Sequence, residues 1–287
     1  MTTTLAHQSG TFALGGERTV TRLGFGTMQL PGPGIWGDPK DPDEAIRVLR
    51  RAVELGVDFI DTADAYGPFV AEDLIRTALH PYGNVAVATK GGFLRPRPGG
   101  DWPILGRPDY LRQCVEMSLR RLAVERIDLY QLHRIDPQVP LEEQVGTLKD
   151  LQGEGKIAHV GLSEVNVNQL RQAQQVATIA SVQNLYNLAD RSAEPLLDYA
   201  EKNGIAFIPW FPLATGALAR DRGPLADIAS RLAASPSQLA LAWLLNRSPV
   251  MLPIPGTSSV AHLEDNLKAA SLALSEDDIA LLTAAVS

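Results

Sequence analysis

Short apolar segments alternate along this chain with longer stretches whose apolar residues recur every three or four positions. The first repeat shows the pattern, because residues 23–26 read as a strand and Ile46, Leu49 and Val53 follow at helical spacing before Gly56. Seven further strand-like segments cover residues 57–60, 85–89, 127–132, 157–162, 180–183, 205–208 and 251–254. Helix-like stretches follow them at 70–79, 108–122, 141–152, 166–176, 194–202, 225–232 with 236–245, and 260–269. Eight strand–helix repeats predict an α/β fold of the (β/α)8 TIM-barrel type, with parallel strands inside and helices outside.

The two ends of the chain add elements to this repeat. Residues 11–20 read as a β-hairpin with Gly15 and Gly16 at its turn, and we expect it to cap the bottom of the barrel. A closing helix after Ser275, together with the additional helix at 225–232, gives the barrel extra C-terminal helices. A chain of 287 residues is long enough for one well-buried core, so we expect residues 1–287 to form a single barrel domain.

Composition narrows the choice of partners and compartment. The chain has 26 basic and 33 acidic residues and a net charge of −7, which disfavours nucleic acid or an anionic membrane as a main partner. The single cysteine, Cys114, lies on the apolar face of a predicted helix, so we expect a buried thiol and a reducing compartment. The sequence shows no signal peptide and no apolar run long enough to span a membrane, so we expect a cytoplasmic protein. It carries no signal for an oligomeric state.

Two connections are longer than a barrel needs. Residues 29–42 contain Trp36, and residues 91–107 contain Phe93, Arg95 and Trp102. Long loops on the active face of a barrel usually shape a pocket, so we expect these side chains to surround one. Surface elaboration is the alternative interpretation.

Four polar side chains lie at, or soon after, the carboxyl ends of predicted strands. Asp61 follows strand 57–60 and is itself followed closely by Tyr66, Lys90 follows strand 85–89, and His133 follows strand 127–132. In a parallel β/α barrel these strand ends converge on the face that carries active sites. The sequence therefore predicts that a carboxylate, a phenol, an amine and an imidazole meet in one site.

This set of groups suits the reduction of a carbonyl by hydride transfer. The carbonyl oxygen gains negative charge and needs a proton, which Tyr66 can donate. A free phenol has a pKa of about 10, and we expect Lys90 to lower it while Asp61 pairs with the ammonium. His133 can hydrogen-bond the substrate oxygen. Each of these side chains alone is more often structural, so the interpretation depends on finding all four at strand ends.

Other chemistries are less well supported by the sequence. No His-x-His pair, His-Glu-x-x-His motif or Cys–His cluster supplies ligands for a metal, so we expect no metal centre. Gly161-Leu162-Ser163-Glu164-Val165 lacks the closing glycine of a nucleophile elbow, which argues against a hydrolase. Gly24-Phe25-Gly26 lacks the third glycine of a Rossmann dinucleotide site.

These residues resemble the aldo-keto reductase family over nearly the whole chain. The specific motifs are Asp61-Thr62-Ala63 with Tyr66-Gly67, Thr89-Lys90, Leu132-His133 and Gly161-Leu162-Ser163. The resemblance implies a catalytic tetrad of Asp61, Tyr66, Lys90 and His133, with Tyr66 as general acid, in an NAD(P)H-dependent reductase of aldehydes or ketones. Segments 28–37, 210–213 and 256–263 look most like the bacterial pyridoxal reductases (pyridoxine 4-dehydrogenases), which implies pyridoxal as a substrate.

The resemblance also implies a nicotinamide cofactor that lies in extended form across the barrel mouth. Ser163 and Gln183 would hydrogen-bond its carboxamide, and Trp210 would stack against its ring. Residues 212–218 would wrap the pyrophosphate, and Asp265 with Asn266 would hold the adenine. The expected cofactor-binding residues are Gly26, Thr27, Ser163, Gln183, Trp210, Pro212, Leu213, Gly216, Gly256, Thr257, Ser258, His262, Asp265 and Asn266.

Two departures from the family pattern leave questions open. Glu164 stands where many members have asparagine after the motif serine, and its role is open. Ser258, Ser259 and His262 carry no fixed positive charge for the adenosine 2′-phosphate. A helix that begins near residue 260 can still bind phosphate at its N-terminus, and the branch that the chain resembles uses NADPH. NADP(H) is therefore the favoured cofactor and NAD(H) the alternative.

A small-molecule carbonyl compound is the expected partner. Aromatic walls with positive charge from Arg95, Arg97 and Arg134 nearby suit a flat heteroaromatic aldehyde such as pyridoxal. The alternatives are a reductase of other aldehydes, or a regulatory barrel that holds the cofactor with little turnover, as some relatives do. The expected substrate pocket contains Met28, Trp36, Phe93, Trp102, Arg134 and Phe211.

Overall fold

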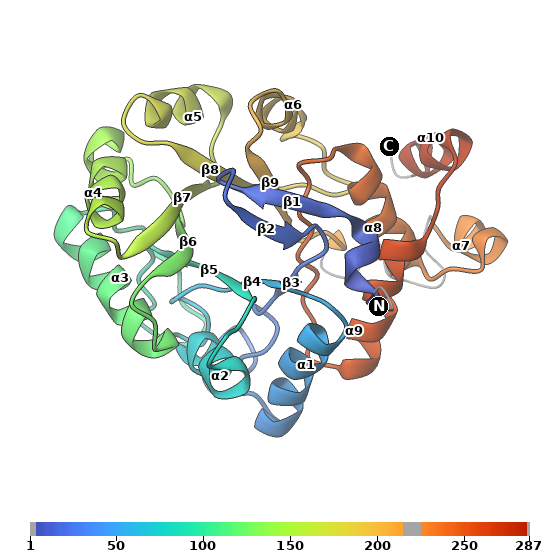
Figure 1. The fold of residues 1–287 in the computed structure, drawn as a ribbon, viewed down its shortest axis with the longest axis horizontal. Coiled ribbons are helices and arrows are strands. Elements are labelled where there is room, and N and C mark those ends of the chain that lie inside the picture. Colours follow the sequence, from blue (N-terminus) through green and yellow to red (C-terminus); the bar gives the residue numbers. More distant parts are fainter. Residues whose placement is uncertain (1–3, 215–224, 286–287) are drawn as a thin grey trace.

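The computed structural model describes residues 4–214 and 225–285 of the chain. Its centre is a parallel sheet with strand order β3-β4-β5-β6-β7-β8-β9, and helices surround this sheet (Figure 1). The strands are β3 (Phe25–Gly26), β4 (Phe59–Asp61), β5 (Ala86–Gly91), β6 (Ile127–Leu132), β7 (Ile157–Ser163), β8 (Ile179–Leu185) and β9 (Ala206–Trp210). The helices are α1 (Pro42–Glu54), α2 (Val70–Leu79), α3 (Pro108–Leu122), α4 (Leu141–Gly153), α5 (Val167–Gln174), α6 (Glu194–Lys202), α7 (Ala226–Leu232), α8 (Pro236–Arg247), α9 (Val260–Leu267) and α10 (Glu276–Ala284). This arrangement confirms the predicted α/β barrel.

The segment predicted as the eighth strand closes the barrel in an irregular form. Met251 forms a parallel bridge with Phe207 of β9, and the Leu252 N–H donates to the Phe207 carbonyl over 2.8 Å. On the other side the Gly24 N–H, next to β3, donates to the Pro253 carbonyl over 2.9 Å. Prolines at 253 and 255 have no N–H to donate, so this segment accepts from β3 without forming a regular ladder. The prediction was right about its position and wrong about its regularity.

The N-terminal hairpin covers one end of the barrel, as predicted. Strands β1 (Thr11–Leu14) and β2 (Arg18–Thr21) pair in antiparallel register across the Gly15-Gly16 turn, and they lie across the centre of the ring in Figure 1. Leu14 and Val20 are fully buried and pack in one cluster with Phe59 and other inward side chains of the barrel. The hairpin therefore closes the bottom and leaves the carboxyl ends of the strands free for a site.

Helix boundaries follow local capping signals. The Asp41 carboxylate accepts from the Glu44 N–H over 2.8 Å, with Pro42 at the first turn of α1. Ser235 and Ser275 form capping boxes at the starts of α8 and α10. Cys114 is buried in α3, and burial raises the pKa of its thiol to about 12, as expected for an inert core cysteine.

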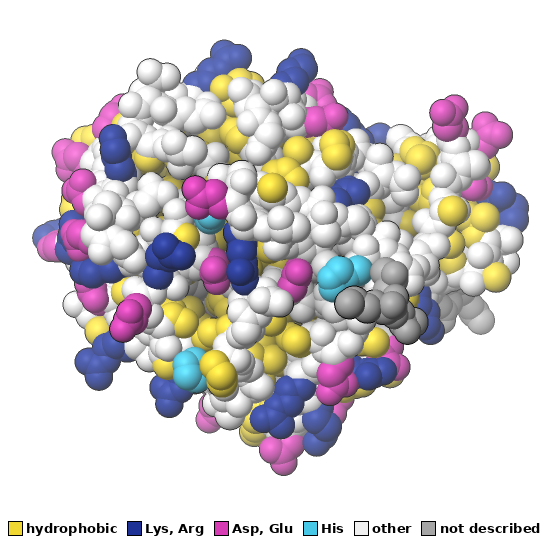
Figure 2. All heavy atoms as spheres, viewed as in Figure 1, with side chains coloured by type: hydrophobic (Ala, Val, Ile, Leu, Met, Phe, Trp, Pro, Cys, Tyr) yellow, Lys and Arg dark blue, Asp and Glu magenta, His cyan; other side chains and the backbone are white. Residues whose placement is uncertain are grey.

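The outer surface mixes charges of both signs. Figure 2 shows Lys and Arg interspersed with Asp and Glu around the hairpin-capped face, so a one-sided electrostatic field does not extend across this face. Across residues 4–214 and 225–285, none of the helices combines the length and the apolar character that crossing a membrane requires.

Candidate active site

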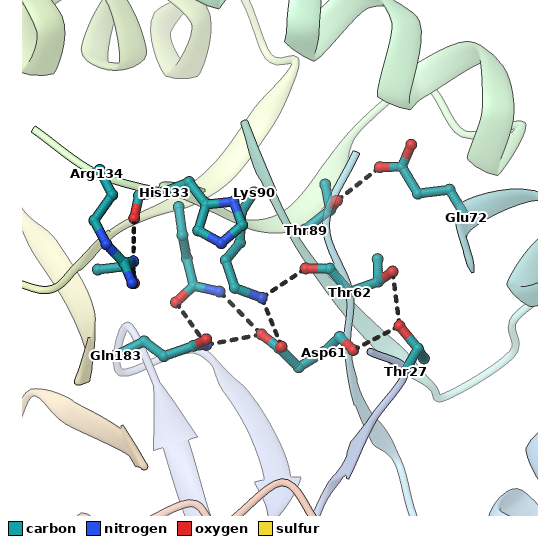
Figure 3. A network of polar contacts seen from close by, with 11 residues as sticks. Thr27, Asp61, Thr62, Glu72, Thr89, Lys90, His133, Arg134 and Gln183 are labelled. Carbon is teal, nitrogen blue, oxygen red and sulfur yellow. Dashed lines mark hydrogen bonds and ion pairs between the residues drawn. The ribbon is translucent and has the colours of Figure 1, made fainter. Parts of the chain in front are cut away.

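Three neighbouring strands bring the predicted catalytic side chains together at the open end of the barrel. Asp61 is the last residue of β4 and pairs in register with Ala88 of β5. Lys90 lies two residues beyond Ala88, so its side chain points to the same inner face as Asp61. His133 directly follows β6, and its backbone N–H donates to the Gly91 carbonyl over 2.9 Å. Figure 3 shows Lys90 joined to Asp61 by a hydrogen bond, and His133 joined to Arg134 through its backbone carbonyl.

The Asp61–Lys90 ion pair forms the floor of the site. The Lys90 ammonium donates to Asp61 Oδ2 over 2.6 Å and to the Thr62 carbonyl over 2.7 Å, and both side chains are at most 2% exposed. Burial lowers the pKa of Lys90, but the Asp61 carboxylate and the Tyr66 phenol raise it more, so it lies above its usual value. The lysine therefore keeps its positive charge inside the protein.

Two amides fix the other oxygen of this carboxylate. Asp61 Oδ1 accepts from the side-chain nitrogens of Gln183 over 2.9 Å and Gln131 over 3.1 Å. Gly161 makes room for this contact, because a Cβ atom there would meet the Gln131 side chain at 2.9 Å and the Ser181 hydroxyl at 2.3 Å. Sequence reasoning missed Gln131. The signal available was a polar residue near the end of a strand, two positions before His133 and so on the same face of that strand.

Tyr66 lies next to the Asp61–Lys90 ion pair, at the open part of the site. It lies after the short turn in which its N–H donates to the Ala63 carbonyl, and the Lys90 nitrogen lies 5.2 Å from the centre of its ring. Burial raises the pKa of the phenol, and the Lys90 charge lowers it by a smaller amount, so the net pKa is above 10.0. Lys90 lowers this pKa as expected, but the sequence did not predict that burial would raise it by more. The phenol is protonated at neutral pH and ready to donate.

His133 is a neutral imidazole in this site. Burial, followed by the positive charges of Lys90 and Arg134, holds its pKa well below 6.5. Its ring lies 6.1 Å from that of Tyr66 and 4.5 Å from that of Phe93, measured between ring centres. Among the residues that the structure describes, its buried Nδ1 atom has no hydrogen-bond partner. A neutral imidazole can donate one hydrogen bond without adding charge.

Two cavities meet at these side chains. Tyr66, Gln183, Trp210 and Phe211 line both of them, together with Met28. The larger, of about 310 Å³, is also lined by Gly26, Gln29, Asp61, Pro212, Leu213, Ile254, Pro255 and Gly256. The smaller, of about 260 Å³, is also lined by Phe93, Trp102, His133, Arg134 and Ser163. A proton donor thus lies at the junction of two spaces, as a reaction between two bound molecules requires.

The larger cavity contains much of the predicted cofactor set. Gly26, Gln183, Trp210, Pro212, Leu213 and Gly256 line it, and Ser163 lines the smaller one. The Thr27 hydroxyl is committed to Thr62 and to the Asp61 carbonyl. Thr257 is buried, its hydroxyl accepting from the Ser259 N–H, and Asn266 is buried in α9. Gly216 lies outside the described residues.

The remaining predicted cofactor residues lie along α9. Ser258 lines a separate cavity of about 320 Å³ together with residues of the 28–41 loop and the start of α1, and His262 is exposed. Both oxygens of Asp265 accept from α8, from the Ser235 hydroxyl over 2.6 Å and from the Gln238 amide over 2.7 Å. An adenine contact would have to share these oxygens.

The smaller cavity contains most of the predicted substrate set. Met28, Phe93, Trp102, Arg134 and Phe211 line it, whereas Trp36 is not among the described residues that line either cavity. Trp36 and Trp102 instead flank Arg95, whose guanidinium carbon lies 5.3 Å and 3.8 Å from their ring centres. Arg95 donates to the Ala65 and Ile35 carbonyls and so holds the two long loops together.

Glu164, whose role the sequence left open, turns away from the larger cavity. Its Oε1 atom accepts from the indole N–H of Trp210 over 2.5 Å and from the Leu185 N–H over 2.7 Å. Beside it the Ser163 hydroxyl accepts from Arg134 over 2.9 Å. The carboxylate therefore fixes an aromatic wall that both cavities share.

These residues fit a flat, amide-bearing heteroaromatic group in the larger cavity. Trp210 offers a ring face, Gln183 offers an amide carbonyl oxygen beside it, and the Tyr66 phenol lies on the cavity wall. The polar groups at the two cavities thus match a nicotinamide ring in one space and a carbonyl compound in the other.

Comparison with known proteins defines the class to which this site belongs. The model of the aldo/keto reductase family matches residues 22–287, so the chain belongs to that family and is a nicotinamide-dependent oxidoreductase. It is 43% identical over 281 residues to the pyridoxine 4-dehydrogenase of Escherichia coli, covering 96% of this chain and 97% of that protein. An uncharacterized oxidoreductase of Schizosaccharomyces pombe is 52% identical over 277 residues, covering 96% and 90%. The structure of an aldo-keto reductase from Klebsiella pneumoniae in complex with NADPH superposes with a TM-score of 0.81 at 26% identity, covering 95% of this chain and 93% of that one.

Proposed function

We propose that this chain reduces pyridoxal to pyridoxine with NADPH, as one cytoplasmic barrel domain. The observation that carries the proposal is the position of Tyr66, which lines both cavities above the buried Lys90–Asp61 pair. The 43% identity to a pyridoxine 4-dehydrogenase over nearly the whole chain supports pyridoxal as the aldehyde. The single cysteine is buried and needs no oxidising compartment.

Each residue of the proposed tetrad has a distinct task. A nicotinamide cofactor, when bound, supplies the hydride for the carbonyl carbon. Tyr66 gives its proton to the carbonyl oxygen, and the Lys90 ammonium stabilises the phenolate that remains. Asp61 keeps Lys90 in place over 2.6 Å, and neutral His133 donates a hydrogen bond that orients the carbonyl. Solvent then returns a proton to Tyr66.

The smaller cavity suits a flat aromatic aldehyde. Phe93, Trp102 and Phe211 provide aromatic surface on its walls. Arg134 adds a positive charge and uses one guanidinium nitrogen for the His133 carbonyl and the Ser163 hydroxyl. Its other nitrogens can serve an electronegative ring substituent, such as the oxygen next to the aldehyde in pyridoxal.

NADPH is the proposed reductant because a structural neighbour contains it and the chain resembles an NADPH-using branch. NADH is the alternative for a physical reason. The first N–H of α9, that of Val260, already donates to the Glu44 carboxylate over 3.1 Å. A negative side chain thus occupies the helix end where we place the 2′-phosphate.

The test is to mix the purified chain with pyridoxal and either NADPH or NADH and to follow absorbance near 340 nm. We expect oxidation of NADPH, and a Tyr66→Phe variant slower by about 10²-fold or more that still binds the cofactor. Unchanged turnover in that variant would remove Tyr66 as the acid. Cofactor binding without oxidation would move the search to a panel of other aldehydes, and failure with all of them would favour a regulatory barrel.

A further inference from the structure

The carboxylate of Glu164 is bound to the aromatic wall of the site. Glu164 directly follows Ser163 at the end of β7 and is half-buried. It accepts from the Trp210 indole over 2.5 Å and from the Leu185 N–H of β8 over 2.7 Å, so one oxygen joins three neighbouring strand ends. A hydrogen bond between a carboxylate and an N–H is shorter and stronger than one between neutral groups. The indole is therefore held in one orientation.

The backbone on both sides of this contact is strained. Glu164 has a φ of 56° and Phe211, next to Trp210, has a φ of 51°. Residues with a side chain rarely adopt this left-handed region, and such strain persists where surrounding contacts impose it. The Asn187 side chain donates to the Phe211 carbonyl over 3.0 Å and so holds the second strained residue. Glutamate in this conformation is not explained by packing alone, because asparagine or glycine would adopt it at lower cost.

Trp210 lies near two opposite charges, the guanidinium of Arg134 and the carboxylate of Glu164. The guanidinium carbon of Arg134 lies 5.9 Å from the centre of the indole ring, which places a cation beside it. The Glu164 carboxylate at the indole N–H offsets that charge and increases electron density in the ring. An electron-rich indole attracts a positively charged aromatic ring more strongly than a neutral one.

We propose that Glu164 is a positioning residue that tunes Trp210 to favour the oxidised nicotinamide, which is cationic, over the neutral reduced form. The proposal rests on the proposed function, because the nicotinamide must lie against Trp210. In the direction of aldehyde reduction, a hydride leaves the reduced ring for the carbonyl carbon, the Tyr66 proton goes to the oxygen, and positive charge appears on the ring. A wall that stabilises this charge stabilises the transition state more than the ground state.

The Glu164→Gln variant tests the charge at residue 164 separately from the orientation of the Trp210 indole. Glutamine keeps an oxygen to accept from the indole N–H but carries no charge. We expect its affinity for NADP⁺ to fall by about three- to tenfold, with the affinity for NADPH kept within about twofold. Glu164→Ala removes the acceptor as well, and we expect both affinities to fall. The indole N–H resonance of Trp210, assigned by its loss in Trp210→Phe, should move far in the alanine variant and little in the glutamine variant.

Binding constants for NADP⁺ and NADPH, measured by titration calorimetry, test this directly. Glu125→Gln is the matched control, since it removes the same charge from an exposed site just before β6, at the closed end of the barrel. An unchanged NADP⁺-to-NADPH affinity ratio in Glu164→Gln would overturn the role of Glu164 and leave the proposed function standing. Failure of the unaltered chain to bind either form would overturn the proposed function, and this role with it.

Discussion

A buried ion pair lies on each side of strand β5, and the two pairs differ in what surrounds them. Lys90 points into the barrel and pairs with Asp61, whereas Thr89 points outward and donates to Glu72 over 2.6 Å. Glu72 also accepts from Arg121 of α3 over 2.5 Å, with side chains 0% and 14% exposed. Figure 3 shows the Thr89–Glu72 contact on the far side of the strand from Asp61.

The difference shows that burial of an ion pair does not by itself identify a catalytic one. The inner pair has a titratable phenol above it, and Asp61 itself lines the larger cavity, so its charge acts on a place that a ligand can reach. The outer pair joins α2 to α3 and lines neither of the two cavities, so its charge acts only on its neighbours. We therefore expect substitutions in the inner pair to change the rate and those in the outer pair to change stability.

The largest expected effect comes from removing the inner cation. Lys90→Met leaves Tyr66 without the charge that stabilises its phenolate, so we expect kcat for aldehyde reduction to fall by about 10²- to 10⁴-fold. Gln131 and Gln183 still donate to Asp61, which should keep the fold. Steady-state kinetics together with a thermal melt measure both quantities.

Lys149→Met, at an exposed position on α4, is the control for loss of a lysine. A kcat for Lys90→Met within threefold of that of the unaltered chain would show that the inner pair is structural. The inner and outer pairs would then not differ in role.

The next effect is on stability and comes from the outer pair. Arg121→Met leaves the fully buried Glu72 with Thr89 as its remaining donor, and we expect the free energy of unfolding to fall by about 3–5 kcal/mol. The kcat of the folded fraction should not change. Urea denaturation measures the loss, and Arg120→Met, one residue earlier and exposed, is the control. A loss of activity without a loss of stability would contradict this assignment.

Asp64 is a third buried carboxyl group, and it forms an ion pair with neither Lys90 nor Arg121. Its Oδ1 atom has no hydrogen-bond partner among the described residues, and burial, followed by the charge of Glu72, raises its pKa from 3.8 to about 7. The folded protein therefore holds this proton between about pH 4 and pH 7, where the unfolded chain releases it. The stability that this group contributes is complete below about pH 4 and is lost as the pH rises through 7.

Asp64→Asn should abolish that pH dependence. We expect the stability of the variant relative to the unaltered chain to improve by about 2–4 kcal/mol as the pH rises from 4 to 8. Urea denaturation at several pH values measures the difference. A constant difference across this range would mean that Asp64 has a cationic partner in solution.

Local patterns in the sequence predicted the elements and the strand-end residues well. The bounds of α2, α3, α6 and β6 agree with those predicted, because α2 and β6 begin and end at apolar residues and α3 and α6 have a proline in their first turn. Asp61, Lys90 and His133 met as predicted because strand direction and a period of two determine where strand-end side chains point. The segment at 251–254 is irregular because two prolines lack the N–H that a strand ladder needs. Their effect on strand pairing depends on which strands lie beside the segment in the folded barrel.

Contacts across the barrel could not be predicted in the same way. Gln183 lines the larger cavity, and its nitrogen also donates to Asp61, which is 122 positions away in the chain. Arg95 was expected at the pocket rim, and two backbone carbonyls and two tryptophans engage it. The role of Glu164 was open from the sequence, and its carboxylate accepts from the Trp210 indole. Each of these contacts depends on which distant segments approach one another in the folded chain. No local sequence pattern predicts that.

The smallest expected effect concerns an exposed ion pair, which extends the contrast between the two buried ones. Glu44 and Arg47 pair over 2.8 Å with side chains 29% and 57% exposed, and pairs of this kind contribute little to stability. Glu44 nevertheless accepts from the Val260 N–H at the start of α9, and this hydrogen bond, followed by Arg47, lowers the pKa of its carboxyl. The charge of Glu44 thus acts on the helix end where we place the 2′-phosphate. Like the charge of Asp61 at the larger cavity, it lies where a ligand can bind.

Glu44→Gln should shift cofactor preference and leave stability unchanged. Removing the negative charge from the positive end of α9 should raise affinity for NADPH relative to NADH by about two- to fivefold. The gain should shrink at high salt, because solvent ions screen exposed charges. Titration of both cofactors measures the ratio, with Glu54→Gln as the control at the far end of α1, where Glu54 pairs with Arg51. Equal gains for both cofactors would place the 2′-phosphate away from α9 and would show that the Glu44 charge acts on a part that the two cofactors share.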